Sequence, residues 1–391
     1  MKGLSLISAA LLFVSCSSDN STSTETLSDQ LDLTDFFSIN FNDLPNYSDQ
    51  YIPVYVNKDN TPGNNSITNQ GATLGRVLFY DTNLSTNNTV SCASCHKQEH
   101  AFSDTNGLSQ GVDGETGRHS MRLINSRFAN ETNFFWDERA SSLEQQTTMP
   151  IQDHVEMGFS DENGDLGFSD LIVKLESIGY YPDLFNLAFG NTEITEIKIQ
   201  NALAQFVRSI QSFDSKYDIG RLQVANDGAA FPNYTNIENL GKTLFLQPPV
   251  FDSSGTRING GFGCAGCHQA PEFDIDPSSL NNGVIGTGSG TGADITVTRA
   301  PSLRDVVKLN GESNGPFMHI GMSNNLITVL NHYNEINTAG NSNLDPRLLP
   351  NGNPQNLNMT QEEKDAVIAF IRTLSGTNVY ADTKWSNPFI N

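Results

Sequence analysis

Apolar residues recur at helical spacing in several separate stretches of the chain. In residues 68–81, Leu74, Val77 and Leu78 fall on one helical face. The same spacing predicts a long helix over 193–218 and shorter ones over 236–246, 326–334 and 360–376. No run of alternating apolar and polar residues suggests a sheet. The pattern therefore predicts a mainly α-helical protein.

The predicted helices are separated by long polar loops. Residues 104–120 and 281–294 are rich in Gly, Asn, Ser and Thr, and they lack periodic apolar positions. Loops of this length usually carry function or are disordered. They are also compatible with a large prosthetic group, which supplies core that the chain itself lacks.

The amino terminus resembles an export signal. One Lys is followed by an apolar run over residues 4–14 that is too short to span a bilayer, and Cys16 ends it. We interpret residues 1–16 as a bacterial lipoprotein signal with Cys16 as the lipidated residue; an ordinary cleaved signal is the alternative. Residues 17–34 are polar and are predicted to be a flexible tether.

The net charge of the chain indicates which classes of binding partner are disfavoured. The 391 residues contain 22 Lys and Arg against 44 Asp and Glu, a formal net charge of −22. Nucleic-acid binding is disfavoured, because phosphate contacts need clustered cations. The acidity serves solubility, or it attracts a basic partner.

The remaining cysteines lie in two CxxCH motifs, Cys92-Ala-Ser-Cys95-His96 and Cys264-Ala-Gly-Cys267-His268. This spacing is typical of c-type haem attachment: both thiols bond the porphyrin and the histidine ligates the iron. Four thiolates could instead bind zinc, but such pairs usually lie closer together. A redox-active dithiol would need a thioredoxin-like strand–helix unit, and none is visible. Two covalent haems are therefore favoured.

The two motifs belong to an internal repeat. "GRVLFYDTNLS" precedes the first motif and "GKTLFLQPPVF" the second, each with Gly, a basic residue and Leu-Phe. We predict two cytochrome c-like, mainly α domains with long irregular loops, each around one covalently bound haem. The first spans residues 35–218 and the second 219–391, with the last residues packing back on the first.

Three further blocks resemble the bacterial dihaem cytochrome c peroxidase family, which includes the MauG-type enzymes. They are "FFWDERASSLEQQTTMPIQDHVEMG" from Phe134, "RAPSLRDV" from Arg299 and "GPFMHIG" from Gly315. Together with the two motifs they stand in the family's order over roughly residues 70 to 376.

The resemblance implies a role for each half. The first haem would react with peroxide, and the second would accept electrons. Trp136 matches the tryptophan between the haems, a relay candidate. Glu156 matches the acid beside the peroxidatic iron, where it would move a proton during O–O cleavage. Gln146 matches a polar residue that could hydrogen-bond bound peroxide.

The chain also departs from the family at three places. The loop after the first motif lacks the expected capping His, and His100 and His119 fit that role poorly, which favours an open first haem. Tyr333 stands where peroxidases have Met and MauG-type members have Tyr as distal ligand of the second iron; Met322 and His332 are alternatives. His119 replaces an Asn that helps to hold calcium in the family, although carbonyls near Asn314 and Pro316 remain, so one calcium ion stays an option.

The sequence therefore predicts a lipid-anchored dihaem peroxidase of the periplasm or cell envelope. It would reduce hydrogen peroxide to water with electrons from a small cytochrome c or cupredoxin, and a homodimer is compatible with this function. MauG-like oxidation of a partner protein is one alternative. A dihaem electron carrier without peroxide chemistry is the other.

Overall fold

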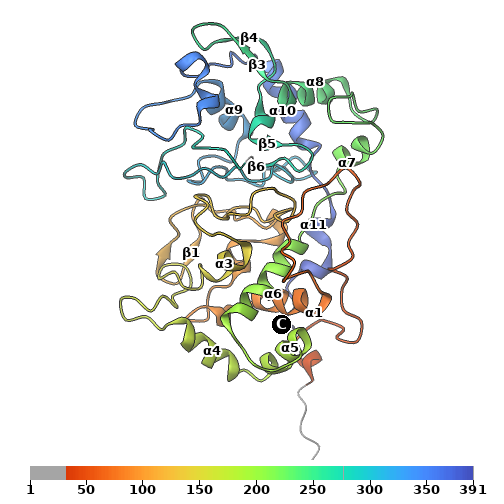
Figure 1. The fold of residues 1–391 in the computed structure, drawn as a ribbon, viewed down its shortest axis with the longest axis vertical. Helices are drawn as coiled ribbons and strands as arrows, with labels where there is room; N and C mark the ends of the chain where they lie inside the picture. The colour runs from red at the N-terminus through yellow and green to blue at the C-terminus, as the bar shows by residue number, and fades with distance from the viewer. Residues whose placement is uncertain (1–31, 276, 391) are drawn as a thin grey trace, which may run out of the picture. The chain divides into compact units, whose positions relative to one another are not determined.

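Each CxxCH motif follows a helix that packs against a second helix from much later in the chain. In the computed structural model, which describes residues 32–275 and 277–390, α1 (Asn69–Tyr80) packs against α6 (Glu196–Ser209). In the same way, α8 (Asn236–Leu246) packs against α10 (Gln361–Arg372), as Figure 1 shows. The repeat in the sequence is thus a repeat of one helix pair.

A glycine lies at the crossing point of each pair. A Cβ on Gly75 would overlap the carbonyl oxygen of Ala202 on α6, and one on Gly241 would overlap the carbonyl oxygen of Ala366 on α10. The glycines in "GRVLFYD" and "GKTLFL" therefore allow two helix backbones to approach closely.

The remaining elements are short, and the predicted mainly α fold with little sheet is confirmed. The other α-helices are α2 (Cys92–Cys95), α3 (Leu143–Thr148), α4 (Phe168–Glu176), α5 (Tyr180–Phe189), α7 (Lys216–Arg221), α9 (Leu326–Asn334) and α11 (Asn378–Ala381). Single 3₁₀ turns are η1 (Leu33–Asp35), η2 (Thr82–Leu84), η3 (Gln98–His100), η4 (Cys264–Gly266), η5 (Pro346–Leu348), η6 (Pro350–Gly352) and η7 (Thr383–Trp385).

The strands form three antiparallel hairpins. β1 (Gln110–Gly111) pairs with β2 (Gly114–Glu115), with Gln110 opposite Glu115. β3 (Pro249–Phe251) pairs with β4 (Arg257–Gly260), with Val250 opposite Asn259. β5 (His268–Gln269) pairs with β6 (Asp274–Ile275), with His268 opposite Ile275.

The predicted single helix over 193–218 is wrong, because the chain breaks between α6 and α7. Asn125 bonds both main-chain groups of Ser212, at 2.9 Å to the N–H and 3.1 Å to the carbonyl. Ser215 then caps α7 by a reciprocal capping box with Asp218. A contact from a distant loop ends the first helix, and a local cap starts the second. Helices 236–246 and 326–334 have the predicted bounds.

Two apolar clusters form the core of Leu33–Asn391, which is one compact unit. The first cluster contains residues between Phe37 and Ile210 together with Val379 and Trp385, and the second contains residues between Tyr217 and Leu374. The last residues return to the first cluster, where the Trp385 Nε1–H lies 3.2 Å from Ser209 Oγ. The predicted domain boundary at residue 218 stays a prediction.

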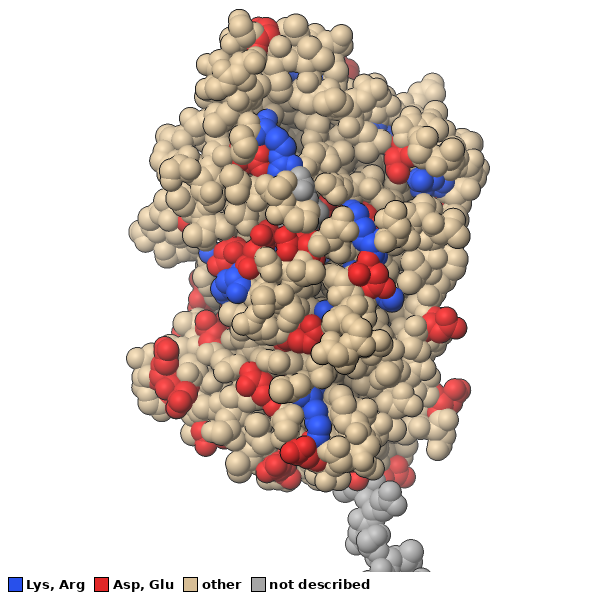
Figure 2. All heavy atoms as spheres, viewed as in Figure 1, with Lys and Arg blue, Asp and Glu red and all other residues tan. Residues whose placement is uncertain are grey.

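On the face drawn in Figure 2, Lys and Arg side chains are scattered among acidic ones. In the part of the chain that the structure describes, no helix is long and apolar enough to cross a membrane. The predicted signal, Cys16 and most of the predicted tether lie outside the described residues.

Candidate active site

The first motif forms one helical turn that ends at its histidine. His96 is the C-cap of α2, and its backbone N–H bonds the Cys92 carbonyl at 2.9 Å. The His96 Nδ1 lies 3.1 Å from the carbonyl oxygen of Phe102. Because an N–H at Nδ1 suits that carbonyl, the lone pair falls on Nε2, which is the arrangement an iron ligand requires.

A cavity of about 530 Å³ opens beside this turn and joins parts of the chain that are distant in sequence. It is lined by all six residues predicted for the first haem and its chemistry: Cys92, Cys95, His96, Trp136, Gln146 and Glu156. The tertiary structure therefore brings the whole predicted constellation together.

The rest of the lining suits a haem. Apolar side chains are contributed by Phe79, Leu143, Leu203 and Val207, and guanidinium groups by Arg118, Arg122, Arg139 and Arg299. A haem is a large apolar ring with two carboxylate substituents. Apolar walls pack against such a ring, and arginines pair with its carboxylates.

The cysteine sulfurs lie in surroundings that favour neutral sulfur. Burial raises the pKa of Cys92 to about 12, and burial does the same for Cys264. Zinc binding requires thiolates, whereas haem attachment converts thiols to uncharged thioethers. Over residues 32–275 and 277–390, no group of three or more His, Cys, Asp or Glu side chains is placed to hold a metal ion.

Glu156 is one of the acids that line this cavity, with Asp137, Asp153, Asp274 and Asp294. Burial, and after it the charge of Asp153, raise the pKa of the Glu156 carboxyl to about 7, against the opposing effect of Arg139. The charge of Glu156 also acts on the thiols of Cys92 and Cys95, which places the carboxyl near the first motif. A group with a pKa near neutrality can both take up and release a proton under ordinary conditions.

Gln146 and Arg139 are two further polar residues of the cavity lining. Gln146 lies on α3, whose N-cap Ser142 accepts the N–H of Gln145 at 3.1 Å. Arg139 places its guanidinium carbon 3.6 Å from the centre of the Phe135 ring. The sequence reasoning missed Arg139, although it lies three residues after Trp136 in the block that carries the resemblance.

Trp136 connects the cavity to the second half of the chain. Its Nε1–H donates to the His119 carbonyl at 2.7 Å. Its own carbonyl accepts the N–H groups of Thr298 and Arg299 at 2.9 and 3.0 Å. Its ring meets that of His319 at an angle of 62° with 6.2 Å between centres. Trp136 is therefore buried where segments after the two motifs meet.

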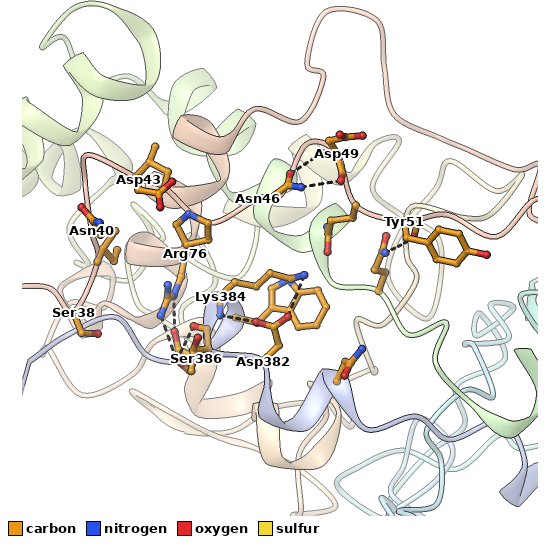
Figure 3. Close-up of a pocket in the computed structure, with 18 of the residues that line it drawn as sticks. Ser38, Asn40, Asp43, Asn46, Asp49, Tyr51, Arg76, Asp382, Lys384 and Ser386 are labelled. Atoms are coloured by element: carbon orange, nitrogen blue, oxygen red, sulfur yellow. Dashed lines mark hydrogen bonds and ion pairs between the residues drawn. The ribbon is translucent and has the colours of Figure 1, made fainter. Parts of the chain in front are cut away.

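A larger cavity, of about 920 Å³, lies elsewhere in the fold (Figure 3). Most of its lining comes from residues 38–51 and from residues 378–386, including Asp43 and Lys384, and Arg76 of α1 also lines it. None of the four motif cysteines lines it, so the smaller cavity is the candidate active site.

The second motif lies on a 3₁₀ turn that leads into β5. Cys264–Gly266 is η4, and His268 is the first residue of the strand. Burial lowers the pKa of His268 to about 4, so its imidazole is neutral near pH 7. A neutral imidazole is the form that ligates iron. The phenol of Tyr333 lies near this motif, since the charges of Cys267 and Cys264 both act on it.

Comparison with known proteins identifies the family. Residues 69–223 match the family model described as di-haem cytochrome c peroxidase. The methylamine utilization protein MauG of Methylophilus methylotrophus is 30% identical over 81% of this chain and 85% of its own length. The chain belongs to the dihaem cytochrome c peroxidase and MauG family.

Other members of the family agree with this assignment. Cytochrome c551 peroxidase of Nitrosomonas europaea is 27% identical over 83% of this chain and 84% of its own length. A crystal structure of a MauG-like protein associated with microbial copper homeostasis superimposes with a TM-score of 0.65 and 26% identity. The superposition covers 86% of this chain and 98% of the MauG-like protein. Membership implies two c-type haems.

The two histidines considered as caps for the first iron are differently placed. His119 is buried, with Nε2 3.2 Å from Ser103 Oγ and Nδ1 3.0 Å from the Asn106 carbonyl. Both of its ring nitrogens are thus already hydrogen-bonded. His100 lies on η3 and is not among the residues that line the cavity.

Of the three candidates for the distal ligand of the second iron, Tyr333 has the clearest contacts. Its hydroxyl lies 3.1 Å from Asn282 Nδ2. His332 Nε2 is held by the Asn282 carbonyl at 2.9 Å. Met322 bonds Phe317 through its backbone N–H. Met318, which the sequence reasoning overlooked, places its sulfur 3.5 Å from the same Asn282 nitrogen.

The residues at the expected calcium position do not fit a calcium ion. The carbonyl of Asn314 accepts a hydrogen bond from Arg122 Nη2 at 2.8 Å. His119, at the family's Asn position, has both ring nitrogens bonded. Calcium prefers clustered oxygen ligands, and a guanidinium beside one of them adds repulsion.

Proposed function

We propose that this member of the family is a peroxidase that reduces hydrogen peroxide to water. The reaction consumes two electrons and two protons for each peroxide and forms two water molecules. The observation that carries the proposal is Glu156: a carboxyl with a pKa of about 7 shares one cavity with Gln146 and the first CxxCH motif.

Each protein group has a defined task in this proposal. Cys92, Cys95 and His96 would hold the first haem, and Cys264, Cys267, His268 and Tyr333 the second. When bound, the first haem supplies the iron that binds peroxide and delivers electrons to it. Gln146 would donate a hydrogen bond to peroxide. Glu156, as carboxylate, would take the proton from the near oxygen and return it to the departing oxygen.

Electrons would come from a small cytochrome c or cupredoxin at the second haem and pass through the Trp136 region to the first. The bonds of Trp136 to His119, Thr298 and Arg299 support this route, because they join the two halves at that residue. We further propose a periplasmic or cell-envelope location with a lipid anchor on Cys16, based on the amino-terminal sequence.

The test uses holoprotein that begins after Cys16, starting from the fully oxidised form. Peroxide-dependent oxidation of a reduced small cytochrome c should proceed without prior reduction, and Glu156→Gln should lower turnover about 10²–10⁴-fold. Glu162→Gln, at an exposed position six residues later, is the matched control and should turn over normally. Absence of turnover in the unaltered protein, even after half-reduction, would contradict a peroxidase.

MauG-like oxidation of a partner protein side chain is the second candidate, because Tyr333 lies beside the second motif and two relatives named MauG reach 30% and 31% identity. In that case peroxide would change the haem spectrum persistently while cytochrome c stays reduced. A dihaem electron carrier would show neither response.

A further inference from the structure

Asn282 contacts two different side chains that could serve the second haem. Its Nδ2 lies 3.1 Å from the Tyr333 hydroxyl oxygen and 3.5 Å from the Met318 sulfur. An amide nitrogen carries two hydrogens, so one N–H is available for each contact.

The direction of this amide is fixed by its neighbours. The backbone N–H of Val284 donates to Asn282 Oδ1 at 3.0 Å. A flipped amide would set its NH₂ against that N–H, so the NH₂ faces Tyr333 and Met318. The Asn282 carbonyl also accepts His332 Nε2 at 2.9 Å, on the helix that carries Tyr333.

The surrounding turn holds the residue rigidly. The side chain of Asn281 donates to the carbonyls of Val284 and Val297 at 3.3 and 3.0 Å. It also accepts the N–H of Gly283 at 2.8 Å. The turn at 281–284 therefore presents the amide of Asn282 in a single position.

Met318 is held in place as well. Its backbone has a φ of +64°, and its carbonyl accepts the N–H of Gly321 at 3.0 Å. Phe317 on one side packs against the second apolar cluster, which Cys264 also contacts. A thioether and a phenol thus stand side by side near the second motif.

We propose that Asn282 is a positioning residue that presents Tyr333, and not Met318, to the second haem iron. This inference rests on the haem assignment in the proposed function. An N–H donated to the phenol oxygen stabilises the charge that oxygen carries as a metal ligand. An N–H donated to sulfur occupies a weak acceptor and keeps the thioether turned towards the amide. Both contacts favour the Tyr333 phenol over the Met318 thioether as the iron ligand.

Loss of the Asn282 amide should exchange the ligand of the second iron from Tyr333 to Met318. Without these two N–H groups the phenol loses its stabilising donor and the Met318 sulfur is released. A thioether ligand raises the potential of a haem relative to a tyrosinate ligand. Asn282 would therefore set the driving force for electron transfer between the two haems.

The experiment compares the ferric spectrum and midpoint potential of the second haem in holoprotein variants. Asn282→Leu removes the amide, and Asn282→Asp keeps its shape but removes the donors. Both should acquire the near-infrared charge-transfer band of a methionine-ligated ferric haem, with a higher potential. Adding Met318→Leu should abolish the new band, whereas adding Met322→Leu, as the matched control, should leave it.

Unchanged spectra and potentials in both Asn282 variants, with full haem content, would overturn the proposal. An unchanged spectrum in Tyr333→Phe would overturn it too, because Tyr333 would then not be a ligand. Peroxide turnover by the unaltered protein is measured separately and reports the proposed peroxidase function alone. Failure of the Asn282 proposal is therefore distinguishable from failure of the proposed peroxidase function.

Discussion

Glu156 gains its acid–base character from burial and from the way its segment is anchored. The carbonyl of Glu156 accepts the N–H of Val112 at 3.1 Å, and that of Val155 accepts the N–H of Asp113 at 3.2 Å. These bonds hold the segment against the β1–β2 hairpin. The carboxyl then lies in the cavity, where water that would stabilise its charge is largely excluded.

The pKa of Glu156 predicts the pH dependence of turnover. The carboxylate form must accept the proton of peroxide, and this form is depleted below a pKa of about 7. Turnover should therefore rise as pH increases through about 7, and level off above it. Initial rates from pH 5 to pH 9 with a saturating donor would show this rise. The residual rate of Glu156→Gln should no longer rise with pH. A rise that persists in this variant would assign the titration to another group.

At the scale of elements, the two crossing glycines control how closely the paired helices pack. Gly75→Ala and Gly241→Ala would each push a methyl group into a helix carbonyl, so each should lower the free energy of unfolding by about 1–3 kcal/mol. Urea unfolding of the holoprotein, followed by circular dichroism, measures the change. Gly63→Ala is the control, since no atom lies within 4 Å of the added Cβ. Equal stability of all three variants would contradict the close crossing.

His154 links the Glu156 segment to two neighbouring loops. Its Nε2 lies 2.9 Å from an Asp113 oxygen and its Nδ1 2.7 Å from an Asp165 oxygen. The hydrogen bond and charge of Asp165, followed by Asp113, raise its pKa above the ordinary 6.5. The imidazolium is therefore present below pH 6.5, and it is lost as pH rises through the raised pKa.

Protection of amides 153–158 from hydrogen exchange should fall as pH rises through that range, after correction for intrinsic exchange rates. His154→Gln carries no charge at position 154 at any pH, so its protection should fall less, and the remaining fall should come from Glu156, whose pKa is about 7. Protection that falls equally in both proteins would show that His154 is not the cause.

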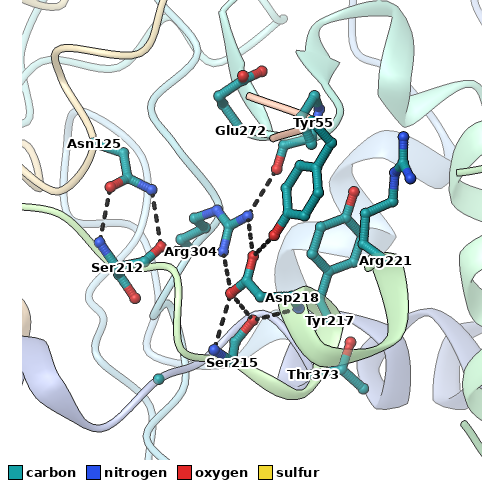
Figure 4. A network of polar contacts seen from close by, with 12 residues as sticks. Tyr55, Asn125, Ser212, Ser215, Tyr217, Asp218, Arg221, Glu272, Arg304 and Thr373 are labelled. Atoms are coloured by element: carbon teal, nitrogen blue, oxygen red, sulfur yellow. Dashed lines mark hydrogen bonds and ion pairs between the residues drawn. The ribbon is translucent and has the colours of Figure 1, made fainter. Parts of the chain in front are cut away.

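At the scale of the molecule, Arg304 joins segments from three parts of the chain (Figure 4). Its guanidinium bonds both carboxylate oxygens of Asp218, at 2.9 and 3.0 Å. The Tyr55 hydroxyl donates to the same carboxylate at 2.6 Å, and the Pro271 carbonyl accepts Arg304 Nη2 at 2.9 Å. Arg304 is fully buried, and its charge helps to keep the pKa of Asp218 below its usual range.

Arg304→Met would leave the Asp218 carboxylate buried without its cation. Removing one partner of a buried pair costs about 3–5 kcal/mol, so the midpoint of urea unfolding should fall accordingly. Arg372→Met, at an exposed position, is the control and should change stability by less than about 0.5 kcal/mol. A similar midpoint for both variants would show that the network contributes little.

Much of the site was predictable because its chemistry is local in sequence. A CxxCH motif carries both thiols and the histidine within five residues, so no tertiary contact is needed to recognise it. The helices at 236–246 and 326–334 were predicted with their bounds, since their apolar spacing and caps are local too. Gln146 and Glu156 came from the family resemblance, which preserves the order of blocks along the chain.

Only the tertiary structure decided how distant segments meet. The break after α6 comes from Asn125, 87 positions away from Ser212. Met318 lies beside Tyr333 only because the Asn282 turn joins them. The guanidinium of Arg122 reaches the Asn314 carbonyl across 192 positions. A sequence pattern reports each residue's own preferences, whereas these contacts depend on packing between segments that share no local signal.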